Sequence, residues 1–395
     1  MGKAGRMEPG NLLVEVKMSH HMPLDTKIVP KSLALCTYAV GLNDWDEHDY
    51  FEEFKSLVKT AGIPVSDTVL LKMRQVDPTY FFTKGKLQEI VNLCSEGGVE
   101  QLVLSSSLTG IQHRNLETAV GATIIDRTDL ILGIFKNAAV SAEGKLQVEI
   151  AEIKIAKTGL VGLGKEMGQQ QAGVGSRGPG ETEKEYLYRH YSELILKAEK
   201  KLKALSSTRD VQRKRRLKCG LPLVSLVGYT NAGKSSIINA LARADVLAED
   251  KLFATLDTTT KEVFLAVGKK LLLSDTVGFI SELPHHLINA FETTLDELRY
   301  AHLLLCVVDS SSSSWPKQVE VVSKTLSDLG VAKRVVYVFN KVDRLSKEEL
   351  QQLKHTVGTS LGRAVFVSAL SHDGLLPLKD MLINDDVLWS IQHVE

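Results

Sequence analysis

The chain has 395 residues, of which 44% are hydrophobic and 24% are charged, a composition typical of a soluble globular protein with two or three domains. Lysine plus arginine equals aspartate plus glutamate at 48 each, so the overall charge indicates neither a nucleic-acid nor a membrane partner. No apolar run is long enough to span a bilayer, which argues against stable membrane insertion. The four cysteines, Cys36, Cys94, Cys219 and Cys306, are far apart, which argues against a zinc site or a disulfide framework.

Residues 1–31 are predicted to form an N-terminal tail. They lack the apolar core of a secretory signal, and acidic residues are interspersed with the basic ones, a poor match to an organelle import sequence. We therefore expect a cytoplasmic protein. A mitochondrion or a plastid is the alternative if the source is eukaryotic.

Residues 32–127 alternate between short apolar runs and segments with helical spacing, which predicts a small parallel α/β subdomain with helices covering the sheet. The predicted strands are Leu33 to Val40, Thr68 to Lys72, Glu100 to Leu104 and Ala122 to Ile125. The predicted helices are Glu47 to Thr60, Lys84 to Cys94 and Gln112 to Val120.

Residues 128–218 carry no strand signal. Leu130 to Ala156 and Glu181 to Leu217 show helical spacing and predict two long helices, separated by a glycine-rich stretch at 159–180. We expect these helices to form a long antiparallel hairpin with the glycine-rich stretch at its tip.

Residues 219–395 return to α/β alternation and predict a further α/β domain, with a mostly parallel sheet and helices on both faces. A final helix is expected near Leu375 to Leu382. The predicted strands are Leu223 to Val227, Val263 to Val267, Lys270 to Leu273, Leu303 to Val308, Val335 to Phe339 and Ala364 to Val367. Each lies near a polar motif, and open α/β sheets bind ligands at the carboxyl ends of their strands.

Five such motifs occur in a fixed order, and each has a separate role in binding a guanine nucleotide. They are Gly228-Tyr229-Thr230-Asn231-Ala232-Gly233-Lys234-Ser235, Phe253-Ala254-Thr255-Leu256-Asp257, Asp275-Thr276-Val277-Gly278, Asn340-Lys341-Val342-Asp343 and Ser368-Ala369-Leu370. Chance would have to supply all five roles in order. We therefore predict that these residues bind GTP and GDP and that 219–395 form a P-loop GTPase domain.

The first motif lies between a predicted strand and a predicted helix, the context that a phosphate-binding loop requires. Gly228 and Gly233 let the backbone curl so that successive amides point at the β-phosphate. Lys234 is predicted to neutralise β- and γ-phosphate oxygens as a catalytic residue, and Ser235 to bind Mg²⁺.

The later motifs are predicted to sense the third phosphate and the base. Asp275 is suited to hold Mg²⁺ through water, and the amide of Gly278, the second predicted catalytic residue, can contact the γ-phosphate. The Asp343 carboxylate can accept hydrogen bonds from N1–H and the 2-amino group of guanine, for which adenine has no matching pair. Ser368 and Ala369 complete the base pocket through a hydroxyl and an amide.

Three further positions concern magnesium, a second cation and the rate of hydrolysis. Thr255 is the predicted second Mg²⁺ ligand, although three more threonines, at 258–260, follow it. Asn231 is the candidate residue for holding a monovalent cation such as K⁺ beside the phosphates. Phe279 stands where a signalling GTPase has a glutamine that orients water, so intrinsic hydrolysis should be slow and should depend on a partner.

These motifs, with several segments upstream, resemble the HflX family of translation-associated GTPases. The upstream segments are Lys84 to Leu87, Gln112 to Glu117, Asp126 to Leu132, Glu143 to Glu149 and Gly175 to Thr182, and 284–298 match downstream. The sequence departs from the family pattern at Thr258 and Lys261, which puts the geometry of the first switch in question, and at Ala172, which replaces one glycine of the hairpin tip. The chain has no room after Leu370 for the extra C-terminal domain of many members.

The resemblance implies a GTPase that binds the large ribosomal subunit and its rRNA, and acts in ribosome splitting, recycling, rescue or subunit biogenesis. The protein is expected to be monomeric when free. Residues 197–218 contain ten basic residues against two acidic ones, enough to bind a phosphate backbone without sequence preference. The predicted RNA contacts are Lys165, Arg177, Arg213, Lys214, Arg215 and Arg216.

Two alternatives remain open from the sequence. In one, the protein is a GTP-sensing, RNA-binding assembly factor in which hydrolysis only times release. In the other, it is a GTPase of tRNA modification, which shares the asparagine of the phosphate loop, although no modification domain is evident.

Overall fold

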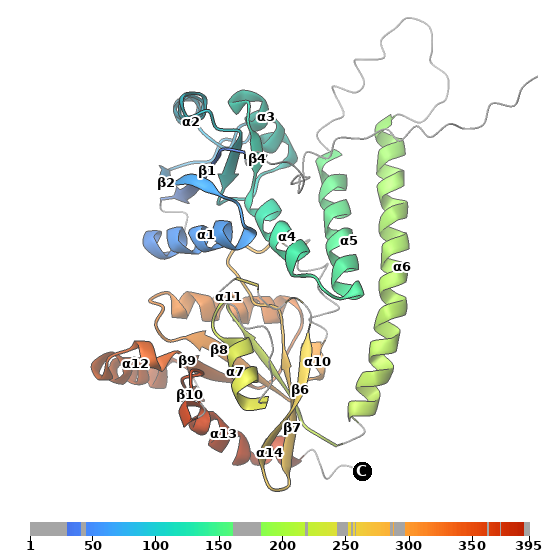
Figure 1. Cartoon of the computed structure of the whole chain (residues 1–395), viewed down its shortest axis with the longest axis vertical. Helices are drawn as coiled ribbons and strands as arrows, with labels where there is room; N and C mark the ends of the chain where they lie inside the picture. The colour runs from blue at the N-terminus through green and yellow to red at the C-terminus, as the bar shows by residue number, and fades with distance from the viewer. Residues whose placement is uncertain are drawn as a thin grey trace, which may run out of the picture.

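A computed structural model of the protein describes residues 30–40, 45–160, 183–217, 220–242, 252–253, 256, 258–284, 287, 297–361, 363–371 and 373–390. Two α/β units lie one above the other, and a pair of long helices runs beside them (Figure 1). The predicted fold class is therefore confirmed.

The N-terminal unit is built on four parallel strands in the order β2-β1-β3-β4. The strands are β1 (Ser32–Ala39), β2 (Val65–Met73), β3 (Gln101–Leu104) and β4 (Thr123–Ile125). The helices between them are α1 (Glu47–Ala61), α2 (Lys84–Gly97) and α3 (Gly110–Val120). These elements match the predicted ones to within a few residues.

Both faces of this sheet are buried, because successive side chains of a strand point to opposite faces. In β1, Leu33 and Leu35 pack in an apolar cluster with residues of α2 and α3. Ala34 and Cys36 pack on the other face with residues of α1. That second cluster also contains residues of the C-terminal unit, so the two units share one apolar core.

The predicted single helix from Leu130 to Ala156 was wrong. The structure has two helices there, α4 (Arg127–Ala138) and α5 (Ala142–Gly159). Ala139 adopts an extended backbone, and the Ser141 hydroxyl accepts a hydrogen bond from the Gly144 amide at 2.8 Å. A serine at this position begins a new helix because its oxygen pairs with an amide that has no partner inside the helix.

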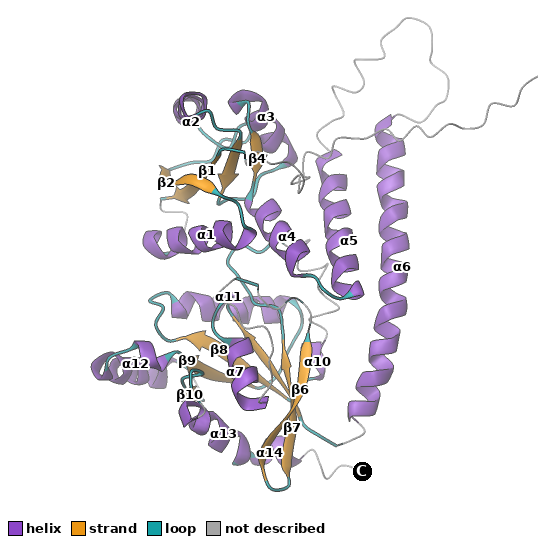
Figure 2. Cartoon of the chain, in the orientation of Figure 1, coloured by secondary structure: helices purple, strands orange, loops and turns teal. Residues whose placement is uncertain are grey.

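The predicted antiparallel hairpin is formed by α5 and the 35-residue α6 (Glu183–Leu217), which lie side by side (Figure 2). Lys154 pairs with Glu199 at 3.2 Å, whereas Lys157, further along α5, lies over the ring of Tyr188, nearer the start of α6. The residue numbers thus run in opposite directions along the contact. Ile153 of α5 and Ile195 of α6 are buried between the helices.

The C-terminal unit has six strands in the order β10-β9-β8-β5-β7-β6, and only β6 pairs antiparallel with its neighbour. The strands are β5 (Leu223–Gly228), β6 (Thr259–Ala266), β7 (Lys269–Asp275), β8 (Leu303–Asp309), β9 (Val335–Asn340) and β10 (Ala364–Phe366). Alternate residues of β8 enter two different apolar clusters, Leu305 on one face and Cys306 on the other.

Helices cover both faces of this sheet. One apolar cluster includes residues of α7 (Lys234–Ala242) and α13 (Leu376–Ile383), and the other includes residues of α11 (Trp315–Asp328) and α12 (Lys347–Ser360). Two short helices, α10 (Glu297–Tyr300) and α14 (Asp386–Trp389), complete the unit. Among the described residues, no helix combines the length and the apolar character needed to cross a membrane.

Candidate nucleotide-binding site

The phosphate loop connects β5 to α7, and its two glycines occupy positions that admit no side chain. Gly228 has φ +150°, and a Cβ there would lie 2.2 Å from the Val307 carbonyl oxygen. Gly233 has φ +94°, and its Cβ would lie 2.2 Å from Nδ2 of Asn340. The loop therefore packs against two neighbouring strands, and its backbone leads directly into the first turn of α7, where amides bind anions.

Lys234, the first residue of α7, is buried beneath this loop. Its ammonium group donates hydrogen bonds to the carbonyl oxygens of Tyr229 at 2.9 Å and Gly228 at 3.2 Å. Burial lowers the pKa of Lys234 to about 8, against the opposing attraction of the Asp275 carboxylate. A cation held in this way has an unmet preference for negative charge, which phosphate oxygens would satisfy.

The lowered pKa predicts that affinity for GTP falls in mild alkali. Only the protonated ammonium group attracts phosphate, and raising the pH through about 8 removes that proton from the free protein. Between pH 7 and pH 9 we expect GTP affinity to fall roughly tenfold, because at one pH unit above the pKa only about a tenth of the lysine is protonated. Titration of the protein with labelled GTP at three pH values measures this, and a constant affinity would contradict it.

Ser235 and Asp275 are brought together as predicted for a magnesium site. The Ser235 hydroxyl donates to Oδ2 of Asp275 at 2.6 Å, and the Asp275 side chain is fully buried at the end of β7. Hydroxyl and carboxylate oxygens are the ligands that Mg²⁺ prefers, and both lie beside the phosphate loop. These two residues therefore fit the ion, which Ser235 would bind directly and Asp275 through water.

The segment after Asp275 lies directly against the phosphate loop. The Phe279 amide donates to the Gly228 carbonyl at 3.1 Å, and the Thr230 amide donates to the Phe279 carbonyl at 2.7 Å. A Cβ added to Gly278 would lie 3.0 Å from Nζ of Lys234 and 3.0 Å from Cα of Thr230. The two predicted catalytic residues, Lys234 and Gly278, are thus adjacent in space.

The two motifs predicted to recognise the base also lie in contact with each other. The Asn340 side chain donates to the Ala232 carbonyl at 3.0 Å and accepts from the Ala369 amide at 3.0 Å, so it joins the phosphate loop to the last motif. The Ser368 hydroxyl donates to the Asp343 carboxylate, which is exposed to solvent. Lys341, with φ +65°, donates to the Asn231 carbonyl at 2.7 Å.

Other predicted site residues have different surroundings. The Thr276 hydroxyl donates to the Leu226 carbonyl, and Leu370 is 84% exposed. Phe253, Leu256 and Val277 are buried in the apolar cluster that the two units share. Ala254, Thr255, Asp257, Lys165 and Arg177 lie outside the described residues, as do the side chains of Arg213, Lys214, Arg215 and Arg216 near the end of α6.

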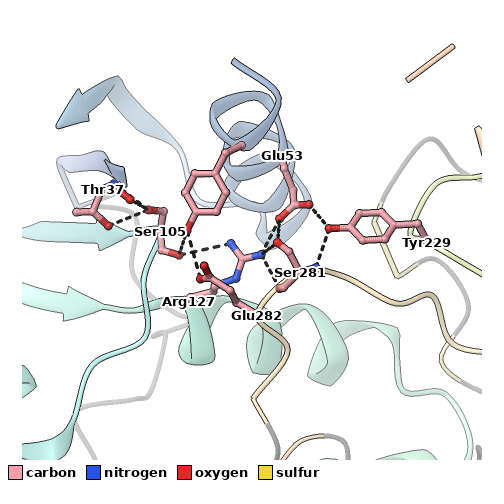
Figure 3. A network of polar contacts seen from close by, with 8 residues as sticks. Thr37, Glu53, Ser105, Arg127, Tyr229, Ser281 and Glu282 are labelled. Carbon is pink, nitrogen blue, oxygen red and sulfur yellow. Dashed lines mark hydrogen bonds and ion pairs between the residues drawn. The ribbon is translucent and has the colours of Figure 1, made fainter. Parts of the chain in front are cut away.

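The sequence-based prediction missed two groups of residues at this site. Asp309, at the end of β8, accepts from Lys341 at 2.7 Å, and its place after an apolar strand was a usable signal. Glu53 and Arg127 of the N-terminal unit contact Tyr229 and Ser281 beside the phosphate loop (Figure 3). Arg127 belonged to a segment used for the family resemblance. Its distance in sequence from Glu53, Tyr229 and Ser281 gave no indication that these residues are in contact.

Comparison with known proteins shows which family this chain resembles. Three family models match: "GTP-binding GTPase N-terminal" over residues 48–136, "GTP-binding GTPase Middle Region" over 138–216 and "50S ribosome-binding GTPase" over 223–341. A crystal structure of SsGBP with GDP is 23% identical and has a TM-score of 0.47, over 89% of this chain and 97% of that one.

Curated relatives are more similar. GTPase HflX of Caldanaerobacter subterraneus is 42% identical over 331 residues, which are 84% of this chain and 75% of the relative. GTPase HflX of Escherichia coli K12 is 39% identical over 317 residues, which are 80% of this chain and 74% of the relative. Similarity at this level extends well beyond the phosphate loop, and it includes the N-terminal unit. The chain therefore belongs to the HflX family and is a GTP-binding GTPase.

Proposed function

We propose that this GTPase binds the large ribosomal subunit and that its nucleotide state controls the association. The observation that carries the proposal is the consecutive match of three family models, of which the one over residues 223–341 is described as a 50S ribosome-binding GTPase. The roles that fit such binding are splitting or recycling of ribosomes, rescue of stalled ones, and subunit biogenesis. A cytoplasmic location is consistent with the bacterial relatives.

The hairpin of α5 and α6 is the proposed rRNA-binding element. The second half of α6 carries most of the basic run at 197–218, and the glycine-rich stretch at 159–180 follows the end of α5. Lysine and arginine bind the RNA backbone mainly by releasing counterions, so this contact should weaken steeply with salt. The proposed contacts are the six basic residues named above from the sequence.

Hydrolysis by the isolated protein should be slow because Phe279 directly follows Asp275–Gly278, which we call the second switch, at the position where a signalling GTPase has a glutamine that orients water. Phe279 is 2% exposed and packs in an apolar cluster with residues of β8 and α11. Family membership implies the magnesium dependence typical of P-loop GTPases, which Ser235 and Asp275 fit. Asn231, with φ +58° in the phosphate loop, is the proposed K⁺ residue, and equal turnover in potassium and sodium buffers would exclude that role.

Replacing residues 159–180 with a short flexible linker should weaken ribosome binding without affecting nucleotide affinity. Leu160, the last described residue before 161–182, packs with Ile153, Tyr191 and Ile195 of the hairpin and not with the phosphate loop, so we expect nucleotide affinity to be retained. Co-sedimentation with large subunits, with GDP and with a non-hydrolysable GTP analogue, measures the effect. The intact chain should sediment with subunits more strongly with the analogue.

The control for this deletion is GTP affinity of the same variant, which should match that of the intact chain. Undiminished co-sedimentation of the deletion variant would contradict the role of the hairpin. A lack of any binding by the intact chain, with either nucleotide, would contradict the proposed function as a whole.

A further inference from the structure

Four buried polar residues join the two α/β units beside the phosphate loop, and we call them the Arg127 cluster: Glu53, Arg127, Tyr229 and Ser281. Glu53 lies on α1 and Arg127 is the first residue of α4, so both belong to the N-terminal unit. Tyr229 is in the phosphate loop, and Ser281 follows the second switch. Figure 3 shows the four side chains converging between the units.

The hydrogen bonds of the cluster are closely interlinked. Arg127 is fully buried and donates to Oε1 of Glu53 at 2.6 Å, and to both the carbonyl and the hydroxyl oxygen of Ser281 at 2.9 Å. The Ser281 hydroxyl donates to the same Glu53 oxygen at 2.7 Å, and its amide donates to the Tyr229 hydroxyl at 2.6 Å. Tyr229 in turn donates to the other oxygen of Glu53.

The charges of the cluster depend on one another because none of its groups reaches solvent freely. Burial alone would lower the pKa of Arg127, but the Glu53 carboxylate, together with Tyr50 and Glu282, outweighs burial and keeps the guanidinium charged. Burial and the same carboxylate raise the pKa of Tyr229 well above its usual value, so its hydroxyl stays neutral. Removing the charge of Glu53 would leave the buried Arg127 without the carboxylate that it hydrogen-bonds, and such losses are costly.

Position in the chain connects this cluster to the nucleotide. Ser281 is two residues after Phe279, whose amide and carbonyl are both hydrogen-bonded to the phosphate loop. Gly278, one residue earlier, lies so close to Lys234 that even a methyl group would crowd it. A γ-phosphate would lie close to both the Lys234 ammonium and the Gly278 amide. Because Gly278 also lies close to the backbone of Thr230, we expect the phosphate to displace the Gly278 segment, which would pull on Ser281, held by the N-terminal unit.

We propose that Glu53 and Arg127 are positioning residues that hold the second switch against the phosphate loop and thereby weaken binding of GTP relative to GDP. GDP lacks the phosphate that must enter between Lys234 and Gly278, so it binds without disturbing the cluster. By thermodynamic linkage, GTP binding loosens the hold of the N-terminal unit on Ser281 to the same extent. The proposal rests on the GTP site and is independent of the proposed ribosome binding.

The test is Glu53→Gln in the full chain, with Glu52→Gln as its matched control. Both residues lie on α1, but Glu52 is half exposed and pairs only with Lys55 of the same helix at 2.6 Å among the contacts described for it. Affinities for GDP and for a non-hydrolysable GTP analogue are measured by calorimetry with magnesium present. Glu53→Gln should shift the ratio of the two affinities toward the analogue by on the order of tenfold, a typical coupling between sites. Glu52→Gln should leave the ratio unchanged.

A merely structural role for Glu53 predicts a different result. Loss of structure would weaken GDP and the analogue equally, and an unchanged ratio in Glu53→Gln would overturn the proposal. If that variant fails to fold, Ser281→Ala takes its place, because it removes one hydroxyl and keeps the ion pair. It should shift the ratio in the same direction by a smaller factor, and no shift, or a shift toward GDP, would overturn the proposal.

Discussion

Replacing Lys234 with alanine should abolish measurable binding of both GTP and GDP at micromolar protein concentrations. The ammonium group is buried beneath the phosphate loop, and it is held by two carbonyl oxygens of the loop itself. Removing one partner of a buried, charged hydrogen-bonded pair typically costs about 2–5 kcal/mol, or roughly 30-fold to 4,000-fold in affinity. Fluorescence titration with labelled nucleotides measures the loss.

The matched control for this variant is Lys324→Ala, which removes an exposed lysine on α11 and should leave both affinities unchanged. Circular dichroism establishes that Lys234→Ala is folded. Because the lysine carries a cost of burial, its removal should not lower the melting temperature greatly. Retained nucleotide affinity in a folded Lys234→Ala protein would show that the phosphate site has been assigned wrongly.

Replacing Asp343 with asparagine should change which base the protein accepts. The carboxylate is exposed, and the Ser368 hydroxyl fixes its orientation from the last motif. An asparagine can still accept from N1–H of guanine, but its amide group then faces the 2-amino group, donor against donor. An unpaired polar group in such a contact costs about 1–3 kcal/mol, so GTP affinity should fall roughly tenfold to a hundredfold.

Xanthosine triphosphate provides the complementary measurement, because xanthine has a 2-oxo group where guanine has the 2-amino group. The amide of asparagine can donate to that oxygen, so Asp343→Asn should bind the xanthine nucleotide more tightly than the unaltered chain does. Asp328→Asn, an exposed aspartate at the end of α11, is the control and should change neither affinity. Unaltered preference for GTP in Asp343→Asn would rule out this role for the carboxylate.

The sheet of the C-terminal unit was predictable because its signals are local. Most strands are short apolar runs, and predicted site residues such as Asp275 and Asn340 come at their carboxyl ends. In a parallel sheet these ends lie at one edge, so sequence order alone brought the motifs together. Gly228 and Gly233 were also identified from a local signal, the phosphate-loop motif. In the structure both have backbone angles that favour glycine.

The end of α4 was not predictable in the same way. Apolar residues with helical spacing continue on both sides of the break, and the break itself consists of only three residues, 139–141. Val140 within it is 80% exposed, so this apolar residue gave a misleading signal of burial. Ser141 was the available evidence, but a serine begins a helix only where the chain has already turned.

The Arg127 cluster was beyond reach of the sequence for a different reason. Glu53 and Arg127 contact residues more than 150 positions away, Ser281 among them, across the boundary between two units. No spacing rule connects such positions, because the contact depends on how the units pack rather than on either one alone. Arg127 is the first residue of α4. The residues around it in the sequence do not distinguish an arginine buried between two units from an ordinary residue at the start of a helix.

The most direct test of the account is GTP turnover by the intact chain, with magnesium, in the absence and presence of large ribosomal subunits. We predict slow turnover alone, because Phe279 cannot orient water, and acceleration by orders of magnitude with subunits, as partners achieve for other GTPases. Lys234→Ala should remain inactive with subunits, which excludes hydrolysis by contaminants. A turnover rate that large subunits leave unchanged would contradict the account.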